Sequence, residues 1–150
     1  MLDTNMASYV IKGHPPEARE RLASLPMDRI VVSSVTQAEL LYGLARKGHP
    51  PAFASLIRAF LLRAQALPWD SNAATVYGDL RASCAASGIT LGALDMMIAA
   101  HAVATKSILV THDKAFSLVP GGVLAVEDWV AAGCALRTSC WRFCRRPSTK

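Results

Sequence analysis

The sequence predicts an α/β fold in which a central parallel sheet of four to five strands is flanked by helices. Short β-branched runs alternate with longer helical patterns along the chain. The strand candidates are apolar throughout, which is typical of a parallel sheet buried on both faces. The 150 residues are 52% hydrophobic and 18% charged, enough for one domain with a sizeable core. We assign this domain to residues 1–130.

The expected elements follow from local patterns. Met1 and Leu2 occupy the place of a first strand, directly before Asp3. The other strand candidates, bounded by polar residues, Gly or Pro, are residues 30–33, 66–68, 108–111 and 123–126. The expected helices are residues 16–25, 36–47, 51–66, 71–87 and 93–105. Thr36, Pro51 and the pair Asp70 and Ser71 signal helix starts, whereas Gly48 and Gly88 signal helix ends.

The net charge of +5 is a property of the last twenty residues. Residues 1–130 contain eleven Lys and Arg and all eleven acidic residues, so their formal charge is zero. Residues 131–150 add five positive charges and three of the four cysteines. We expect this basic tail to be a disordered or appended extension, with an RNA-contacting arm and a cysteine metal site as alternatives. Cys84 is expected in the core, and no disulfide is implied.

Two observations bear on the compartment. The longest stretch without a charged residue is 82–94, which is shorter than the roughly 18 apolar residues of a membrane span. Asp3 stands where a signal peptide would be basic or apolar. We therefore expect a soluble, cytoplasmic protein.

Four carboxylates fall at the ends of expected elements. Asp3 follows the first strand, and Asp113 follows the strand at 108–111. Glu39 lies in the first turn of the helix at 36–47, and Asp95 lies in the first turn of the helix at 93–105. Ligands of parallel α/β sheets bind at the carboxyl ends of the strands. The four acids are thus expected to share one crevice.

Each acid also has a purely structural explanation. Thr36 and Glu39 have the spacing of a capping box, in which the glutamate bonds back to the backbone. Asp95 is favoured in a first helical turn by the helix dipole, and Asp113 can cap residues 114–118. Asp3 can be a turn residue that precedes a helix. Together, however, four acids in one pocket would repel one another unless a cation neutralised them.

Mg²⁺ or Mn²⁺ suits such a set of hard oxygen ligands. A divalent cation in this place can activate water and offset charge on a leaving oxygen, which is the chemistry of phosphodiester hydrolysis. A phospho-receiver domain also has an acidic pocket on a parallel sheet. It would need an aspartate at the end of a middle strand, where this chain has Ser33 and Ser34.

Four stretches, in order, resemble PIN-domain ribonucleases of the VapC toxin family: LDTN, VVSSVTQAELLYGLARKG, LPWDSNAATVYGDLRASCAASGITLGALDMMIAAHAVAT and ILVTHDKAFSLVPGGVLAVEDW. The resemblance implies a PIN-like sandwich and a Mg²⁺-dependent endoribonuclease, the toxin of a type II toxin–antitoxin system, with Mn²⁺ as an alternative ion. It implies RNA, above all tRNA, as substrate and a cognate VapB-type antitoxin as partner. A homodimer is also expected.

Carried over by position, the resemblance makes Asp3, Glu39, Asp95 and Asp113 a catalytic quartet. Asp3, Asp95 and Asp113 are the expected metal ligands, and Glu39 completes the metal sphere or orients the attacking water. Thr4 and Asn5 are similar to the polar residues after the first acid, and Thr111 to the hydroxyl residue that ends the late strand.

The chain departs from the family pattern in two places. Its first strand is shorter, which could loosen Asp3, and residues continue beyond Trp129, where the pattern normally ends. The shortened strand motivates the alternative of a catalytically weakened PIN-like nucleic-acid-binding module. His112, beside Asp113, is a weaker candidate for a base or phosphate contact, and His101 is expected to be a core or interface histidine.

Overall fold

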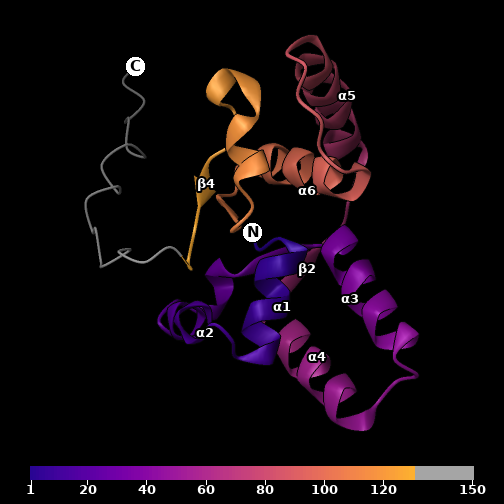
Figure 1. Cartoon of the computed structure of the whole chain (residues 1–150), viewed down its shortest axis with the longest axis vertical. Helices are drawn as coiled ribbons and strands as arrows, with labels where there is room; N and C mark the ends of the chain where they lie inside the picture. The colour runs from indigo at the N-terminus through magenta and orange to yellow at the C-terminus, as the bar shows by residue number, and fades with distance from the viewer. Residues whose placement is uncertain (131–150) are drawn as a thin grey trace, which may run out of the picture.

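A parallel sheet runs through the middle of the protein (Figure 1). In the computed structural model, which describes residues 1–130, β1 (Val31–Ser33) pairs with β2 (Gln65–Leu67), and β3 (Leu109–Val110) pairs with β4 (Val126–Glu127). Leu2 joins the two pairs through parallel bridges to Val32 and Val110. The order β2, β1, Met1–Asp3, β3, β4 agrees with the expected four to five parallel strands. The last strand begins three residues later than predicted. The expectation for the basic tail falls on residues outside the described part.

The first three residues occupy the centre of this sheet. The Leu2 N–H donates to the Val31 carbonyl at 2.9 Å, and the Asp3 N–H donates to the Val110 carbonyl at 3.1 Å. On the same side, the Val110 N–H donates to the Met1 carbonyl at 2.8 Å. The short strand therefore does not loosen Asp3, since hydrogen bonds on both sides fix its backbone direction.

Helices connect the strands. They are α1 (Thr4–Lys12), α2 (Pro16–Ala23), α3 (Ser34–Arg46), α4 (Pro51–Arg63), α5 (Ser71–Ala86) and α6 (Ala93–Ala104), with short 3-10 turns η1 (Met27–Arg29), η2 (Lys114–Leu118) and η3 (Pro120–Gly122). Five helices match the expected ones within a few residues. Helix α1 is not among the expected helices and was foreseen only in the structural alternative for Asp3, which acts as its N-cap. None of the helices in residues 1–130 is long and apolar enough to cross a membrane.

The helices cover both faces of the sheet. One hydrophobic cluster contains residues of α1, α2 and α4 together with Leu2, Val32 and Val110. The other contains residues of α5 and α6 together with Met1 and Leu109. Neighbouring strand residues thus enter opposite clusters, as expected for a sheet with two buried faces. In Figure 1, α1–α4 lie in the lower part, α5 and α6 lie in the upper part, and the N-terminus lies between them.

Candidate active site

Asp3 is the most buried of the four predicted acids. It ends the central strand, and its carboxylate is held from two sides: the Met6 N–H donates to Oδ1 at 2.6 Å, and the Thr111 hydroxyl donates to Oδ2. The whole residue is only 2% exposed. Because Asp3 caps α1, the structural explanation for this residue is correct, and the same contacts fix the direction of its side chain.

Thr111 connects Asp3 with Asp113. Its hydroxyl donates to Asp3 and accepts the Asp113 backbone N–H at 3.0 Å. Asp113 in turn caps η2, as expected, because its Oδ1 accepts the Ala115 N–H at 2.8 Å. Thr111 is itself 1% exposed. The resemblance singled out Thr111, and the structure gives it the physical task of joining two of the acids.

Glu39 does not form the capping box that the spacing suggested. Helix α3 begins at Ser34, and its N-cap is Ser33, whose hydroxyl accepts the Val35 N–H at 3.1 Å. Thr36 therefore lies inside the helix, where its buried hydroxyl has no hydrogen-bond partner among the described residues. The Thr4 hydroxyl instead donates to Glu39 Oε2 at 2.5 Å. This contact turns Glu39 toward the start of α1 and hence toward Asp3.

Asp95 lies in the first turn of α6, two residues later than the helix start. Its Oδ2 lies only 2.8 Å from the position that a Cβ on Gly92 would occupy. The missing side chain at Gly92, the N-cap of α6, leaves the room in which the Asp95 carboxylate sits. Sequence reasoning did not single out Gly92, because a glycine before a helix is equally typical of an ordinary helix start.

The electrostatics join all four acids. Burial raises the pKa of Asp3 above its usual range, and the charges of Asp95 and Asp113 act in the same direction, against the donors Thr111 and Met6. Burial also raises the pKa of Asp95, with further contributions from Glu39 and Asp113. Like charges close together favour the protonated form. Electrostatic repulsion thus links the four predicted acids: Asp95 interacts with each of the other three, and Asp113 also interacts with Asp3. They come from independent elements that end or begin at the carboxyl edge of the sheet.

Comparisons with known proteins show to which family the chain belongs. The family model described as PIN domain matches residues 1–122. The tRNA(fMet)-specific endonuclease VapC of Shigella flexneri is 39% identical over 130 residues, which cover 86% of this chain and 96% of that protein. Ribonuclease VapC2 of Rickettsia felis is 34% identical over 131 residues, with the same coverage. The chain belongs to the PIN-domain family, among its VapC members.

Solved structures of PIN-domain proteins have the same fold. The structure of VapBC2 from Rickettsia felis bound to a promoter DNA fragment superposes with a TM-score of 0.79 at 32% identity, covering 86% of this chain and 97% of that chain. The DNA-bound VapBC from Salmonella typhimurium superposes with a TM-score of 0.78 at 36% identity, covering 86% and 96%. The expected PIN-like α/β sandwich is thereby confirmed.

The donor set of this PIN domain fits a hard divalent cation. Within residues 1–130, no three His, Cys, Asp or Glu side chains are placed to hold a metal ion by themselves. Mg²⁺, however, keeps several waters and is commonly bound by one or two carboxylates plus substrate phosphate. Burial raises the pKa of Asp3 and Asp95, and the charges of the neighbouring acids add to this; a cation among the carboxylates would relieve that repulsion. Site residues and metal remain predictions at this point.

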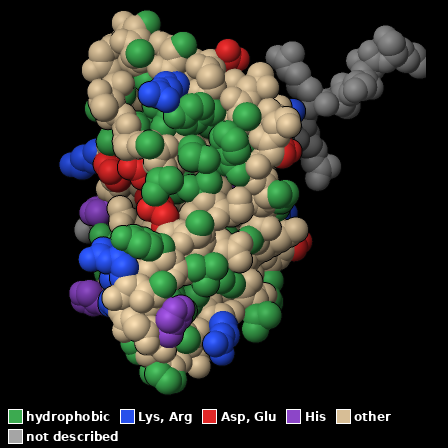
Figure 2. All heavy atoms as spheres, turned by 90° about the vertical axis from the view of Figure 1, so that its right-hand side faces the viewer, with side chains coloured by type: hydrophobic (Ala, Val, Ile, Leu, Met, Phe, Trp, Pro, Cys, Tyr) green, Lys and Arg blue, Asp and Glu red, His purple; other side chains and the backbone are tan. Residues whose placement is uncertain are grey.

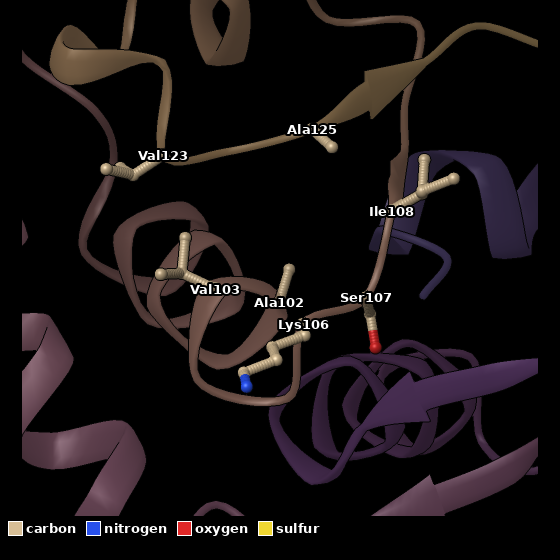
Figure 3. A pocket seen from close by; sticks show the side chains of 7 residues that line it. All are labelled: Ala102, Val103, Lys106, Ser107, Ile108, Val123 and Ala125. Carbon is tan, nitrogen blue, oxygen red and sulfur yellow. The ribbon is translucent and has the colours of Figure 1, made fainter. Parts of the chain in front are cut away.

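A second hollow lies away from the acids. A pocket of about 250 Å³ is lined by Val103, Ile108 and Val123 among others, with Lys106 at its side (Figure 3). These residues precede β3 and β4, so the pocket lies at the amino ends of the strands, whereas the acids lie at the carboxyl ends. It contains no carboxylate and takes no part in the acidic site.

The two histidines of interest have different surroundings. The His112 Nδ1 lies 2.9 Å from the carboxylate of Asp128. This nitrogen is therefore already paired and is not free to act as a base or to contact a phosphate. His101 is 1% exposed and lies in the core, as expected. Its Nδ1 shares a 2.8 Å hydrogen bond with the Ser33 hydroxyl. No sequence pattern pointed to this pairing, because 68 residues separate the partners.

The surface near the acids carries both signs of charge. Figure 2 shows acidic side chains gathered about half-way down the face formed by α3, α5 and α6, with Lys, Arg and His side chains beside and below them. On α3, the Arg46 guanidinium lies 5.7 Å from the centre of the Tyr42 ring. Tyr42 is 64% exposed, so this stacked pair lies at the surface.

Proposed function

We propose that the protein is a Mg²⁺-dependent endoribonuclease that acts as the toxin of a VapBC-type toxin–antitoxin system. The observation that carries this proposal is the convergence of Asp3, Glu39, Asp95 and Asp113 at the carboxyl edge of the sheet. Burial raises the pKa of Asp3 and Asp95, and the negative charges of the neighbouring acids raise it further. Such a group of carboxylates would oppose the approach of a phosphate unless a cation intervened. The relatives are named a tRNA(fMet)-specific endonuclease and a ribonuclease, and these names support an RNA substrate.

In this proposal the acids have separate tasks. Asp3, Asp95 and Asp113 hold Mg²⁺, or Mn²⁺, directly or through water. Glu39 orients the attacking water, since the Thr4 hydroxyl fixes one of its oxygens and leaves the other for a further contact. When bound, the cation activates water and offsets the charge that develops on the phosphodiester. The Thr111 hydroxyl donates a hydrogen bond to the Asp3 carboxylate and so favours its ionised form, against the effect of burial.

The reason for the alternative, a catalytically weakened nucleic-acid-binding module, no longer holds. It rested on a loose Asp3 at the end of a short strand. Hydrogen bonds from Met6 and Thr111 instead fix the Asp3 carboxylate, and the strand pairs on both sides. A site arranged in this way has the rigidity that hydrolysis requires.

The test is RNA cleavage by the purified protein with Mg²⁺, with and without EDTA, beside Asp95→Asn. Asp28→Asn is a matched control, because Asp28 is an exposed acid in η1, before β1 and thus at the opposite edge of the sheet. We expect cleavage by the wild type and Asp28→Asn in Mg²⁺ alone, and a loss of at least a hundredfold in EDTA or in Asp95→Asn. Unchanged cleavage in EDTA or in Asp95→Asn would contradict the metal and carboxylate mechanism. Absence of cleavage by the wild type under every condition would favour the binding module.

For the substrate we propose the initiator tRNA, because the Shigella flexneri relative is named a tRNA(fMet)-specific endonuclease. Initiator and elongator methionine tRNAs, offered in equal amounts, test this choice. We expect cleavage of the initiator tRNA alone. Equal cleavage of both tRNAs, or of any unstructured RNA, would leave the nuclease assignment intact and contradict the choice of substrate.

For the partners we propose a VapB-type antitoxin and a second copy of this chain. The solved neighbours are VapBC complexes, which supports the first. Leu56 and Leu62 of α4 are exposed apolar side chains suited to contact a partner, whereas Ala54, Ile57 and Phe60 of α4 face the core. Co-expression with a VapB-type protein, followed by purification and sedimentation of the complex and of the free chain, tests both. A free chain that sediments as a monomer at micromolar concentration would contradict the homodimer.

A further inference from the structure

Helices α3 and α6 carry Glu39 and Asp95, and they meet away from the acids at a small polar contact. Helix α6 packs against both β1 and α3. Within this interface, the His101 imidazole of α6 lies against the Ser33 hydroxyl at the N-cap of α3. His101 is 1% exposed, and Ser33 is fully buried. Buried polar groups are costly unless paired, so such a pair tends to specify one arrangement of the elements that carry it.

The Ser33 hydroxyl has two partners. Its oxygen accepts the Val35 N–H at 3.1 Å, and it shares a 2.8 Å hydrogen bond with Nδ1 of His101, whose direction depends on the imidazole tautomer. Burial lowers the pKa of His101, and the charge of Asp70 acts in the opposite direction. One hydroxyl thus caps α3 and binds α6 at the same time.

A second link runs parallel to the first. The Trp69 indole N–H donates to the Met97 carbonyl of α6 at 3.3 Å, and the Trp69 backbone N–H donates to the Ser34 hydroxyl at 3.1 Å. The Tyr77 ring packs edge-on against the indole, with ring centres 6.2 Å apart. Met97 and His101 are four residues apart and so lie on one face of α6. Adjacent serines at the start of α3 are therefore both tied to this face.

We propose that His101 is a positioning residue, which with Trp69 braces α6 against the start of α3 and thereby sets the place of Asp95 relative to Glu39. His101 follows Asp95 by six residues, and Glu39 follows Ser33 by six, so each acid lies about 9 Å along a helix from the brace. Helices are stiff over this length, so a shift at the brace moves an acid by a similar amount. A misplacement of 1 Å in a catalytic site can cost about a hundredfold in rate.

The inference rests on the proposed function only for its activity readout, and its test also measures the metal site without RNA. His101→Leu removes the nitrogen that bonds Ser33 and keeps an apolar side chain of similar size. His101→Asn returns an amide group, which can donate or accept, near the place of Nδ1. Trp69→Phe removes the second link and keeps a ring. Cys84→Ala is the matched control, because Cys84 is 1% exposed and belongs to the hydrophobic cluster that contains α6, but takes no part in the brace.

Three quantities are measured for each variant: the thermal midpoint, the Mg²⁺ dissociation constant by calorimetry without RNA, and kcat and KM for RNA cleavage. For His101→Leu we expect kcat to fall about tenfold or more, KM to stay within twofold, and Mg²⁺ affinity to fall about tenfold, as for outer partners of metal ligands. Trp69→Phe follows in the same direction with a smaller effect. His101→Asn recovers most of the loss, and Cys84→Ala lowers the thermal midpoint while kcat and Mg²⁺ affinity stay unchanged.

The outcomes separate the two proposals. A His101→Leu protein with wild-type kcat and Mg²⁺ affinity overturns the brace, as does a Cys84→Ala protein that loses kcat in proportion to its stability. If His101→Leu fails to fold, His101→Asn and Trp69→Phe decide: wild-type Mg²⁺ affinity in Trp69→Phe overturns the brace. A wild type that binds Mg²⁺ and cleaves no RNA contradicts the proposed function, while the calorimetric comparison still tests the brace.

Discussion

Replacement of Thr111 by valine removes one hydroxyl from the centre of the acidic site and leaves its shape almost unchanged. That hydroxyl donates to the Asp3 carboxylate and accepts the Asp113 N–H at 3.0 Å. Thr111 is 1% exposed, so no bulk water replaces the lost donor. Thr111→Ser is the natural control, because it keeps the hydroxyl and removes only a methyl group.

The expected cost follows from the two hydrogen bonds. A hydrogen bond to a charged group contributes about 1.5–3 kcal/mol, and a neutral one contributes about 0.5–1.5 kcal/mol. The Asp113 N–H lies closer to the surface and can bind water, so the loss at Asp3 dominates. We expect the free energy of unfolding to fall by about 2–3 kcal/mol in Thr111→Val. The methyl group lost in Thr111→Ser costs about 1 kcal/mol or less.

Urea denaturation at pH 7 in the presence of EDTA measures this difference. With an m-value of about 1–3 kcal/mol/M, the midpoint of Thr111→Val should lie on the order of 1 M below that of the wild type. The pH profile of RNA cleavage gives a second readout. The Thr111 donor lowers the pKa of Asp3, so its removal raises this pKa and moves the acidic limb of the profile to higher pH. Equal urea midpoints in Thr111→Val and Thr111→Ser, with an unmoved acidic limb, would refute this reasoning.

Three further predictions concern the same site and the tail. In Gly92→Ala the new Cβ would lie 2.8 Å from Asp95 Oδ2, so kcat for RNA cleavage should fall about tenfold. The control Gly78→Ala, whose Cβ meets nothing within 4 Å, should keep the wild-type kcat. Equal kcat values in the two variants would contradict the importance of the close approach at Gly92. Asp95 has a raised pKa, so the folded state binds more protons than the unfolded chain and loses stability as pH rises through that pKa. Asp95→Asn should therefore raise the thermal midpoint of the metal-free protein at pH 7, and this gain should vanish as pH falls below about 4; a gain that persists there would be inconsistent with repulsion. Deletion of residues 131–150 removes five positive charges, so the RNA affinity should depend less on salt concentration, while cleavage at low salt persists. An unchanged dependence of RNA affinity on salt would show that these charges do not contact RNA.

Local patterns were sufficient for most of the elements. Apolar β-branched runs located β1 and β3, a short apolar run before Trp69 located β2, and proline and glycine located the start of α4 and the ends of α3 and α5. The errors arose where two signals compete. At the start of α3, Ser33, Ser34 and Thr36 are all suitable caps, and only the Val35 N–H to Ser33 contact decides among them. Helix α1 was left out of the expected helices because the strand end and the helix start were treated as alternatives for Asp3. Asp3 is both a strand end and a helix cap.

The candidate site was predictable to the level of residue type and edge of the sheet. Strand ends and first helical turns place Asp3, Asp95 and Asp113 at the carboxyl edge in any parallel α/β fold. The structural explanations proved correct for Asp3 and Asp113, yet they did not exclude the shared pocket, because a capping carboxylate uses one oxygen for the cap. For Glu39 the structural explanation was wrong, since its carboxylate binds the Thr4 hydroxyl and not its own helix.

The sequence by itself predicted the parallel α/β class, most of the elements in order and the position of the four acids at element ends, because periodicity and position relative to strand ends are local properties. The resemblance to the family, and not a local pattern, singled out Thr4 and Thr111. Tertiary structure alone decided which oxygen binds which donor. The bonds from Thr4 to Glu39, from Thr111 to Asp3 and between His101 and Ser33 span 35, 108 and 68 residues. Such contacts depend on how the helices pack on the two faces of the sheet, and no local pattern specifies contacts between residues so far apart in the sequence.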